Sequence, residues 1–327
     1  MRKPSENDWR ILTMLKFALS RLLSAIPTLF IVSMAVFGLI RLIPGDPASL
    51  MLGDLAHADA LAAARQSMGL DKPVPLQFVI WLGNVMQGDL GHSVLNGQPV
   101  LDLVLQRFST SAWMVLIAVG LSVLIAVPLG MAAAWKQNGG LDLAIVAMST
   151  LLLSIPTFWL GLMILLGFGL KLGWLPVLGY VSVTDDPVAG LIYLIMPVAT
   201  LVLHEVGIIV RMARASTLDV LRLDYITHAR AKGLGEAAVL LRHAARNAFG
   251  PTWTLIGLIL GNLLGGVAVV ETVFTIPGLG RLIVDSIYAR DYAVVQGCLL
   301  FVAVTYLLVN LLVDLLYPLF DPRVTAE

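Results

Sequence analysis

The sequence predicts an all-α membrane protein with six transmembrane helices, because of its composition and because its apolar residues gather in six long stretches. Of the 327 residues, 58% are hydrophobic and 13% are charged. Soluble globular proteins carry about 25% charged residues and about 45–50% apolar ones. A soluble core does not require so large an excess of apolar residues, whereas a body embedded in lipid does.

Each of the six stretches is long enough to cross the hydrocarbon core, which takes about 20 predominantly apolar residues. Charges, glycine and proline clusters, or Trp and Tyr bound each stretch, and these aromatic rings favour the membrane interface. A proline removes a backbone hydrogen bond, so Pro128 and Pro156 are expected to kink the second and third helices. The predicted helices are Leu22–Ile43, Ser111–Trp135, Leu143–Leu170, Leu191–Val210, Pro251–Val270 and Val294–Pro318.

The basic residues indicate an orientation. Fourteen Lys and Arg residues fall on the side of the N-terminus and seven on the opposite side, so the positive-inside rule places both termini in the cytoplasm. The first apolar stretch is longer than the about 7–15 residues of a signal peptide, and it is expected to remain as a span. Trp9–Arg21 is predicted to be a short amphipathic helix on the cytoplasmic face. The predicted segments are 1–21 (cytoplasmic), 22–43 (first helix), 44–107 (extracytoplasmic), 108–318 (five-helix core containing a cytoplasmic loop, 211–250) and 319–327 (cytoplasmic tail).

The extracytoplasmic segment is too long to be a simple connection, so it is expected to carry its own structure. Helices are predicted at Asp59–Met68 and Leu76–Gln87, each followed by a glycine. The second of them has an apolar stripe at helical spacing. That stripe packs either on the membrane surface or against a partner protein, and it consists of Phe78, Trp81, Leu82 and Val85.

The cytoplasmic loop contains a short helix with its own end signals. Asp224 is a favourable N-cap for a helix that begins at Tyr225. Arg230 and Lys232 occupy its last turn, where positive charge complements the helix dipole. Gly233 then suits the left-handed position that ends many helices. A short, separately capped helix between two spans has little use as a linker, but it suits a lever held by a protein outside the membrane.

This short helix resembles the cytoplasmic "EAA" loop of ABC importer permeases. The peptide branch of that family has the form D-Y-x-x-x-A-R-A-K-G-L, which residues 224–234 fit throughout. Thr227 and His228 depart from the general E-A form, and the literal Glu-Ala-Ala at 236–238 does not fit, because Arg242 stands where the motif needs Gly. Other stretches resemble the same branch in the same order along the chain, namely residues 41–47, 88–93, 155–161, 173–176, 271–274, 277–281, 289–297, 311–317 and 321–323.

The resemblance implies the six-helix core of a type I importer permease in a bacterial inner membrane. The chain would pair with a second, homologous permease, with two ATP-hydrolysing subunits that bind ATP and Mg, and with an extracytoplasmic solute-binding protein. Peptide is the expected cargo, and glutathione or nickel importers of the same branch are the alternatives. Arg230 and Lys232 would meet acidic groups of an ATPase subunit, while small residues allow close approach. The implied coupling helix comprises Asp224, Tyr225, Thr227, His228, Ala229, Arg230, Ala231, Lys232 and Gly233.

For Gly233, a helix stop alone and a coupling role both stay open. The sequence lacks the motifs expected for ATP binding or zinc binding. It has no G-x-x-x-x-G-K-[ST] loop for ATP and no His/Cys pair at zinc-ligand spacing. The chain is therefore expected to be non-catalytic, with no cofactor, metal or nucleic-acid partner of its own. His57 and His92 form no obvious metal cluster, which disfavours nickel. Cys298 lies in an apolar run and is expected to be a small buried hydrophobe.

His204 and Glu205 are ionisable residues inside the fourth predicted span. Such residues usually face the bundle interior or a water-filled cavity. They could line the pathway or an inner gate, or Glu205 could pair structurally with Arg211 or with a neighbouring chain. As a proton relay they would fit a secondary transporter, the rival class, but no convincing inverted repeat occurs between the two halves.

Small residues form one face of the fifth predicted span, at Gly257, Gly261 and Gly265. Glycines at this spacing let helix backbones approach closely in lipid. The face packs either against another helix of this chain, or against the partner permease or along the pathway. Asp314, near the inner end of the last span, is expected to have a helix-packing or interface role.

Overall fold

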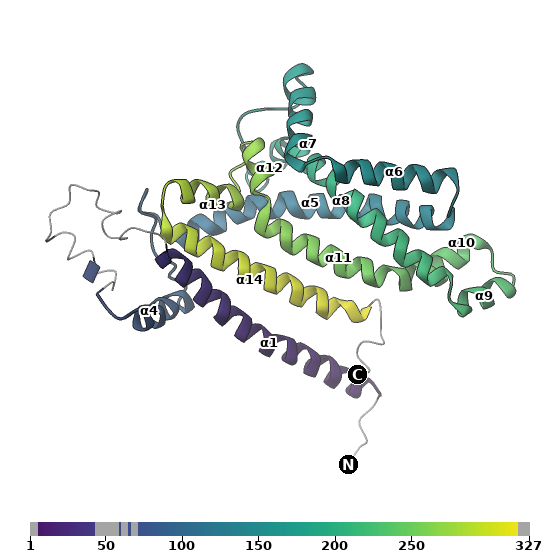
Figure 1. Cartoon of the computed structure of the whole chain (residues 1–327), viewed down its shortest axis with the longest axis horizontal. Helices are drawn as coiled ribbons and strands as arrows, with labels where there is room; N and C mark the ends of the chain where they lie inside the picture. The colour runs from purple at the N-terminus through teal and green to yellow at the C-terminus, as the bar shows by residue number, and fades with distance from the viewer. Residues whose placement is uncertain (1–5, 43–58, 60–64, 67–70, 320–327) are drawn as a thin grey trace, which may run out of the picture.

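The computed structural model describes residues 6–42, 59, 65–66 and 71–319, and its regular elements within these ranges are all helices. Figure 1 shows long helices lying side by side, with short helices at both ends of the bundle. Within the described residues, five helices are long and apolar enough to cross a membrane, or six if one bent pair counts as a single span. The all-α fold is therefore confirmed. The five are α1 (Glu6–Leu42), α5 (Val100–Trp135), α8 (Pro187–Leu221), α11 (Ala245–Gly266, with the short helices before it) and α14 (Tyr292–Leu316).

The first helix corrects one prediction. The amphipathic segment Trp9–Arg21 is not a short helix of its own, because α1 runs without interruption for 37 residues from the N-terminal segment through the first span. No glycine or proline separates the two parts, and extending an existing helix adds a hydrogen bond for each residue ordered.

Helix α4 (Val74–Met86) matches the second helix predicted in the extracytoplasmic segment. Its aromatic stripe packs on α1 of the same chain, where the rings of Phe78 and Phe37 are 5.2 Å apart and those of Trp81 and Phe37 are 5.5 Å apart. Neither the membrane surface nor a partner protein is needed to cover these two rings. The other predicted helix, Asp59–Met68, lies outside the described residues apart from positions 59, 65 and 66.

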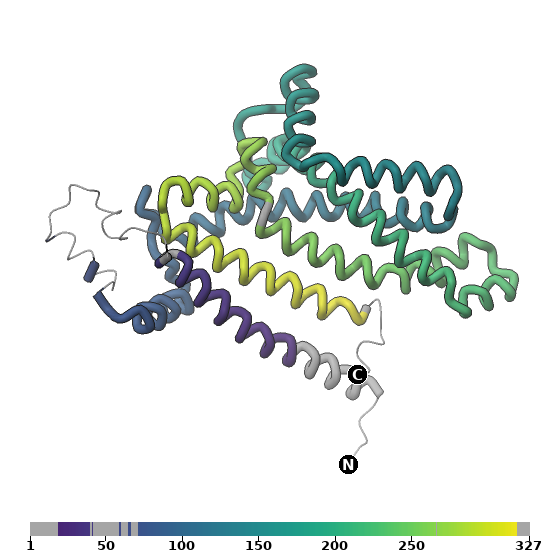
Figure 2. Tube along the Cα trace, in the orientation of Figure 1, coloured from purple at the N-terminus to yellow at the C-terminus, as the bar shows by residue number. Residues whose placement is uncertain are grey.

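The predicted third span, Leu143–Leu170, is not one straight helix. It consists of α6 (Gly140–Ser154), α7 (Thr157–Ile164) and the π-helical η1 (Leu165–Lys171), and the chain bends by 95° after α6. Figure 2 shows this trace turning sharply out of the direction of its neighbours. Pro156 lacks an N–H, and the residue before it, Ile155, is extended with φ −90° and ψ 123°. The other predicted kink site, Pro128, lies inside a continuous α5.

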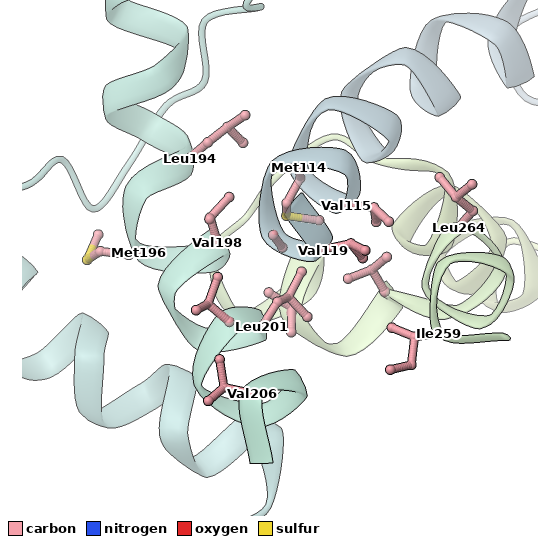
Figure 3. Close-up of a cluster of buried hydrophobic side chains, with 14 of the residues drawn as sticks. Met114, Val115, Val119, Leu194, Met196, Val198, Leu201, Val206, Ile259 and Leu264 are labelled. Atoms are coloured by element: carbon pink, nitrogen blue, oxygen red, sulfur yellow. The ribbon is translucent and has the colours of Figure 1, made fainter. Parts of the chain in front are cut away.

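The core of the bundle lies between α5, α8 and α11. Figure 3 shows side chains of α5 and α8 facing one another, with α11 closing the cluster. At Gly130 of α5 an added Cβ would lie 2.7 Å from the Val210 carbonyl oxygen of α8, so this glycine is required for the close approach of the two helices. Helix α8 also extends past the predicted end of its span, so Arg211 lies within the helix. The buried core includes Met114, Val115, Val119, Leu194, Val198, Leu201, Ile259 and Leu264.

The glycine face of α11 lies against α14 of the same chain. An added Cβ would lie 2.5 Å from a Val313 side-chain atom at Gly257, and 2.8 Å from the Tyr306 ring at Gly261. At Gly265 the neighbour is again a side chain of α14. Intrachain packing thus accounts for these three glycines, and a partner permease is not needed to explain them.

Short helices lie at the two ends of the bundle. One end carries α9 (Asp224–Ala231), α10 (Glu236–Ala238) and the π-helical η2 (Val239–Ala244), and the opposite end carries α4 and α13 (Leu279–Tyr288) (Figure 1). We call these the α9 end and the α4 end. Helix α12 (Ala268–Val273) follows α11, and a short 3₁₀ turn, η3 (Tyr317–Leu319), follows α14. Asp314 of α14 pairs with Arg21 of α1 at 3.3 Å, which joins these two helices.

Candidate functional site

Helix α9 begins one residue earlier than predicted. Leu223 is its N-cap, and Asp224 is the first helical residue with no capping bond from its side chain. The prediction that Asp224 caps the helix is therefore wrong. A carboxylate in the first turn still interacts favourably with the positive end of the helix dipole, which is why the position suits an acidic residue.

The end of α9 has a defined backbone geometry. Gly233 has φ +81°, a left-handed conformation that glycine adopts without steric cost. The Gly233 N–H donates to the Arg230 carbonyl at 2.9 Å, and the Leu234 N–H donates to the Ala229 carbonyl at 3.4 Å. These two bonds form a Schellman motif, which satisfies carbonyls that the helix would otherwise leave free.

One face of α9 is buried within the chain itself. Ile226 is fully buried and Ala229 nearly so, against side chains of α8, η2 and α11. Ala229, one of the small residues expected to allow close approach to an ATPase subunit, therefore contacts its own chain instead of lying on the exposed face. The opposite face is exposed, and it carries Thr227, His228, Arg230, Ala231 and Lys232.

Polar contacts hold α9 to the segment that follows it. The Tyr225 hydroxyl accepts a hydrogen bond from Asn247 Nδ2 at 2.8 Å and donates to the His243 carbonyl at 3.4 Å. Arg230 pairs with Glu236 of α10 at 3.2 Å, with both side chains partly exposed to solvent. Through these contacts and the buried face, α9 is attached to the ends of both α8 and α11, so a displacement of α9 acts on two long helices.

At the α4 end, two segments that resemble family motifs meet around a buried carboxylate. Glu271 of α12 is fully buried, and its Oε1 accepts a hydrogen bond from Ser111 Oγ at 2.5 Å. Its Oε2 accepts from the Arg281 N–H at 2.8 Å, and the Leu279 N–H donates to Ser111 Oγ at 2.8 Å. An added Cβ at Gly278 would overlap the carboxylate. The carboxylate therefore holds the start of α13 against α12 and α5.

A second buried carboxylate joins another pair of motifs. Asp291 Oδ2 accepts from Ser93 Oγ at 2.5 Å and from the Val94 N–H at 3.1 Å, while its Oδ1 accepts from Val294 N–H at the start of α14. Sequence reasoning assigned no role to Glu271 or Asp291. In the sequence, each of them is only an acidic residue beside an apolar span. The residues that bind them, Ser111 and Ser93, are too distant along the chain to be inferred from that pattern.

His204 and Glu205 lie in α8 without the predicted structural pair. Glu205 is buried, and its Oε2 has no hydrogen-bond partner among the described residues; the same holds for His204 Nδ1. No ion pair in the described part of the chain joins Glu205 to Arg211, whose side chain is exposed. The prediction that Glu205 could pair with Arg211 of the same chain is therefore wrong.

A different, partly buried ion pair supports this part of the bundle. Arg214 of α8 donates to Asp142 of α6 through two nitrogens, at 2.6 and 2.7 Å, and the Asn138 N–H donates to the same carboxylate at 2.9 Å. Sequence reasoning missed this pair. Cys298 is fully buried as predicted, and no cluster of three or more potential metal ligands occurs among the described residues, which exclude His57.

Comparison with known families decides the class of the chain. Residues 126–326 match the family described as "Binding-protein-dependent transport system inner membrane component", and residues 14–115 match the N-terminal region of such membrane components. The chain belongs to this family. It is a multi-pass membrane component of a transport system, and we call it the permease from here on.

Curated relatives of the permease match it over nearly its whole length. A probable peptide ABC transporter permease protein of Sinorhizobium fredii is 40% identical, over 94% of this chain and 98% of its own length. A putative peptide transport system permease protein of Brucella suis is 40% identical with the same coverage. A glutathione transport system permease protein of Pectobacterium atrosepticum is 42% identical, over 95% of this chain and 99% of its own length.

Proposed function

We propose that the permease forms the membrane pathway of an ATP-driven, binding-protein-dependent importer of di- and oligopeptides. The observation that carries the proposal is α9, a short helix fixed to the ends of α8 and α11 with its other face exposed. Relatives named as peptide permeases, 40% identical over 94% of this chain and 98% of their own length, support the choice of cargo. Glutathione is the second candidate, since a glutathione permease is equally similar and glutathione is itself a modified tripeptide.

The importer is heteromeric in this proposal. A second, homologous permease completes the pathway, two separate subunits bind ATP and Mg, and an extracytoplasmic solute-binding protein delivers the peptide. The permease itself is non-catalytic. Both termini and the α9 end face the cytoplasm, as the excess of Lys and Arg on that side favours.

Coupling works through the two faces of α9. Its exposed face, with His228, Arg230 and Lys232, docks against an ATPase subunit, where the basic side chains meet acidic groups. Its buried face, with Ile226 and Ala229, transmits the displacement to α8 and α11. Closure of the ATPase pair then moves the ends of α8 and α11 together. This movement of the pathway helices produces alternating access.

His204 and Glu205 are proposed to line the pathway or an inner gate. The supporting observation is that Glu205 is buried and one of its carboxylate oxygens has no hydrogen-bond partner among the described residues, although ionisable groups in spans are costly unless they meet a partner or water. A neighbouring subunit or water in the pathway would supply that partner.

The proposal is tested by reconstituting the permease into liposomes with its partner permease, ATPase subunits and binding protein. ATP-dependent accumulation of tri-alanine or glutathione is expected, and it should stop when any one component is omitted. Uptake by the permease alone, driven by a proton gradient, would instead identify a secondary transporter and overturn the proposal.

A further inference from the structure

A polar cavity of about 640 Å³ opens at the first turns of α5, away from α9. Three segments line it: residues 106–110 of α5, residues 180–185 before α8, and Pro277. Ligand pockets for small molecules typically have volumes of about 300–1,000 Å³. Pro277 directly precedes the Gly278–Arg281 segment that holds Glu271, so the cavity lies beside the buried network at the α4 end.

Two polar groups of this cavity have unused hydrogen-bonding capacity. Arg107 Nε and the Tyr180 hydroxyl are both buried, and neither has a hydrogen-bond partner among the residues that the structure describes. The contact of the Arg107 guanidinium is a long one, from Nη1 to the Pro277 carbonyl at 3.5 Å. A guanidinium offers five N–H donors. Buried polar groups without partners are rare in native proteins, and a bound ligand or water is one explanation for them.

The cavity also separates two opposite charges. Arg107 is the one cation and Asp185 the one anion among the lining residues, and no ion pair joins them in the described part of the chain. The Asp185 carboxylate is exposed, and the one hydrogen bond that it accepts from the described residues is long, 3.5 Å from the Thr184 hydroxyl. The other polar lining groups are uncharged: Gln106, Ser109, Thr110, Ser182 and Thr184.

We propose that this cavity is a docking site for a short peptide with free termini, on its way from the binding protein into the pathway. Arg107 and the Tyr180 hydroxyl bind the C-terminal carboxylate, and Asp185 binds the N-terminal ammonium. A guanidinium matches a carboxylate through paired N–H donors, which favours Arg over Lys at such a site. The inference rests on the proposed importer function, and it names a selective step within this permease.

The charge pattern favours a peptide over a segment of the binding protein. A docking segment of a protein has no free backbone termini and offers such charges only where its side chains carry them, whereas every free peptide carries one carboxylate and one ammonium group. Those two groups match the one guanidinium and the one carboxylate of the cavity. The hydroxyl and amide groups between them suit a peptide backbone of any sequence.

The test uses the complete reconstituted importer and compares tri-alanine with its C-terminal amide. Arg107→Gln is expected to lower tri-alanine uptake by about tenfold or more, the size that follows from losing one hydrogen bond to a charged group. Uptake of the amide should change less than about twofold, since a neutral amide gains little from a guanidinium. Arg107→Lys should restore uptake in part. Arg290→Gln, an exposed arginine outside the cavity, is the control and should leave both peptides unaffected.

The amino end has its own pair of probes. Asp185→Asn should lower uptake of tri-alanine while leaving N-acetyl-tri-alanine unchanged relative to the wild-type permease. If the Arg107 variant fails to assemble, Tyr180→Phe keeps the ring and removes only the hydroxyl, and it should show the same selectivity for the free carboxylate. If the wild-type complex imports glutathione in place of tri-alanine, glutathione and its glycyl ethyl ester replace the peptide and amide.

Three results would overturn the inference. The first is unchanged tri-alanine uptake in both Arg107→Gln and Tyr180→Phe. The second is an equal loss for tri-alanine and its amide, which indicates a structural role. The third is loss of ATPase stimulation by the peptide-free binding protein, which indicates that the cavity receives the binding protein instead. Failure of the wild-type complex to import tri-alanine or glutathione would count against the proposed function, and is distinguishable from all three.

Discussion

Replacing Gly233 by residues that tolerate a left-handed backbone progressively less well perturbs the end of α9 without introducing a clash. An added Cβ at Gly233 meets nothing within 4 Å, so the cost comes from φ +81° alone. For residues other than glycine and asparagine this conformation costs about 1–2 kcal/mol, and a β-branched side chain is the least compatible. Relaxation of that strain would break the two bonds to the carbonyls of Arg230 and Ala229.

We therefore expect peptide uptake to fall in the order Gly, Asn, Ala, Val at position 233, while ATP hydrolysis by the assembled importer continues. The assay measures uptake and ATPase rate on the same proteoliposomes, and their ratio reports coupling. Gly235→Val is the matched control, because Gly235 lies two residues away, has φ −64° and also has open space around an added Cβ. Normal coupling in Gly233→Val, or an equal loss in Gly235→Val, would refute the assignment of Gly233.

Three further predictions concern the buried face of α9, the ion pair between α6 and α8, and Glu205 of α8. Ile226→Ala should lower the free energy of unfolding of the permease by about 2–5 kcal/mol, because a fully buried side chain is truncated. Thr227→Ala on the exposed face of α9 should change this free energy little. Thermal unfolding in detergent compares the two variants. Asp142→Asn should cost about 1–3 kcal/mol by leaving the partly buried Arg214 without its charged partner, and a second change, Arg214→Met, should recover part of the loss in the same melting assay. Glu205→Gln should slow uptake while leaving assembly intact, and unchanged transport would assign Glu205 a structural role.

The spans were predictable because a run of about 20 apolar residues is a local property of the sequence. The positions of the helix ends were less predictable. Helix α5 begins at Val100 and α8 continues to Leu221, since a helix keeps adding hydrogen bonds beyond the apolar window until a breaking residue or a packing contact stops it. The same reason explains why α1 absorbs the segment predicted as a short amphipathic helix.

The third span shows where local signals stop being sufficient. Pro156 and Pro128 are equal as helix-breaking residues, yet the chain bends by 95° at the first and α5 continues through the second. After the bend, Gly161 of α7 packs closely on Phe274 and Thr200, where an added Cβ would lie 3.3 and 3.5 Å from their side chains. Contacts with other helices thus accompany the large bend, and they are invisible in the sequence around either proline.

The membrane class, the approximate spans and the short helix that precedes Gly233 could be predicted from the sequence, because hydropathy and helix-end signals depend on residues close together in the chain. Which face of that helix is buried depends on the packing of the whole chain, and so do the contacts of Ser111 with Glu271 and of Ser93 with Asp291, pairs separated by 160 and 198 residues. Buried polar groups must find hydrogen-bond partners wherever the packing of the helices places them. Only the packed bundle shows which partners those are.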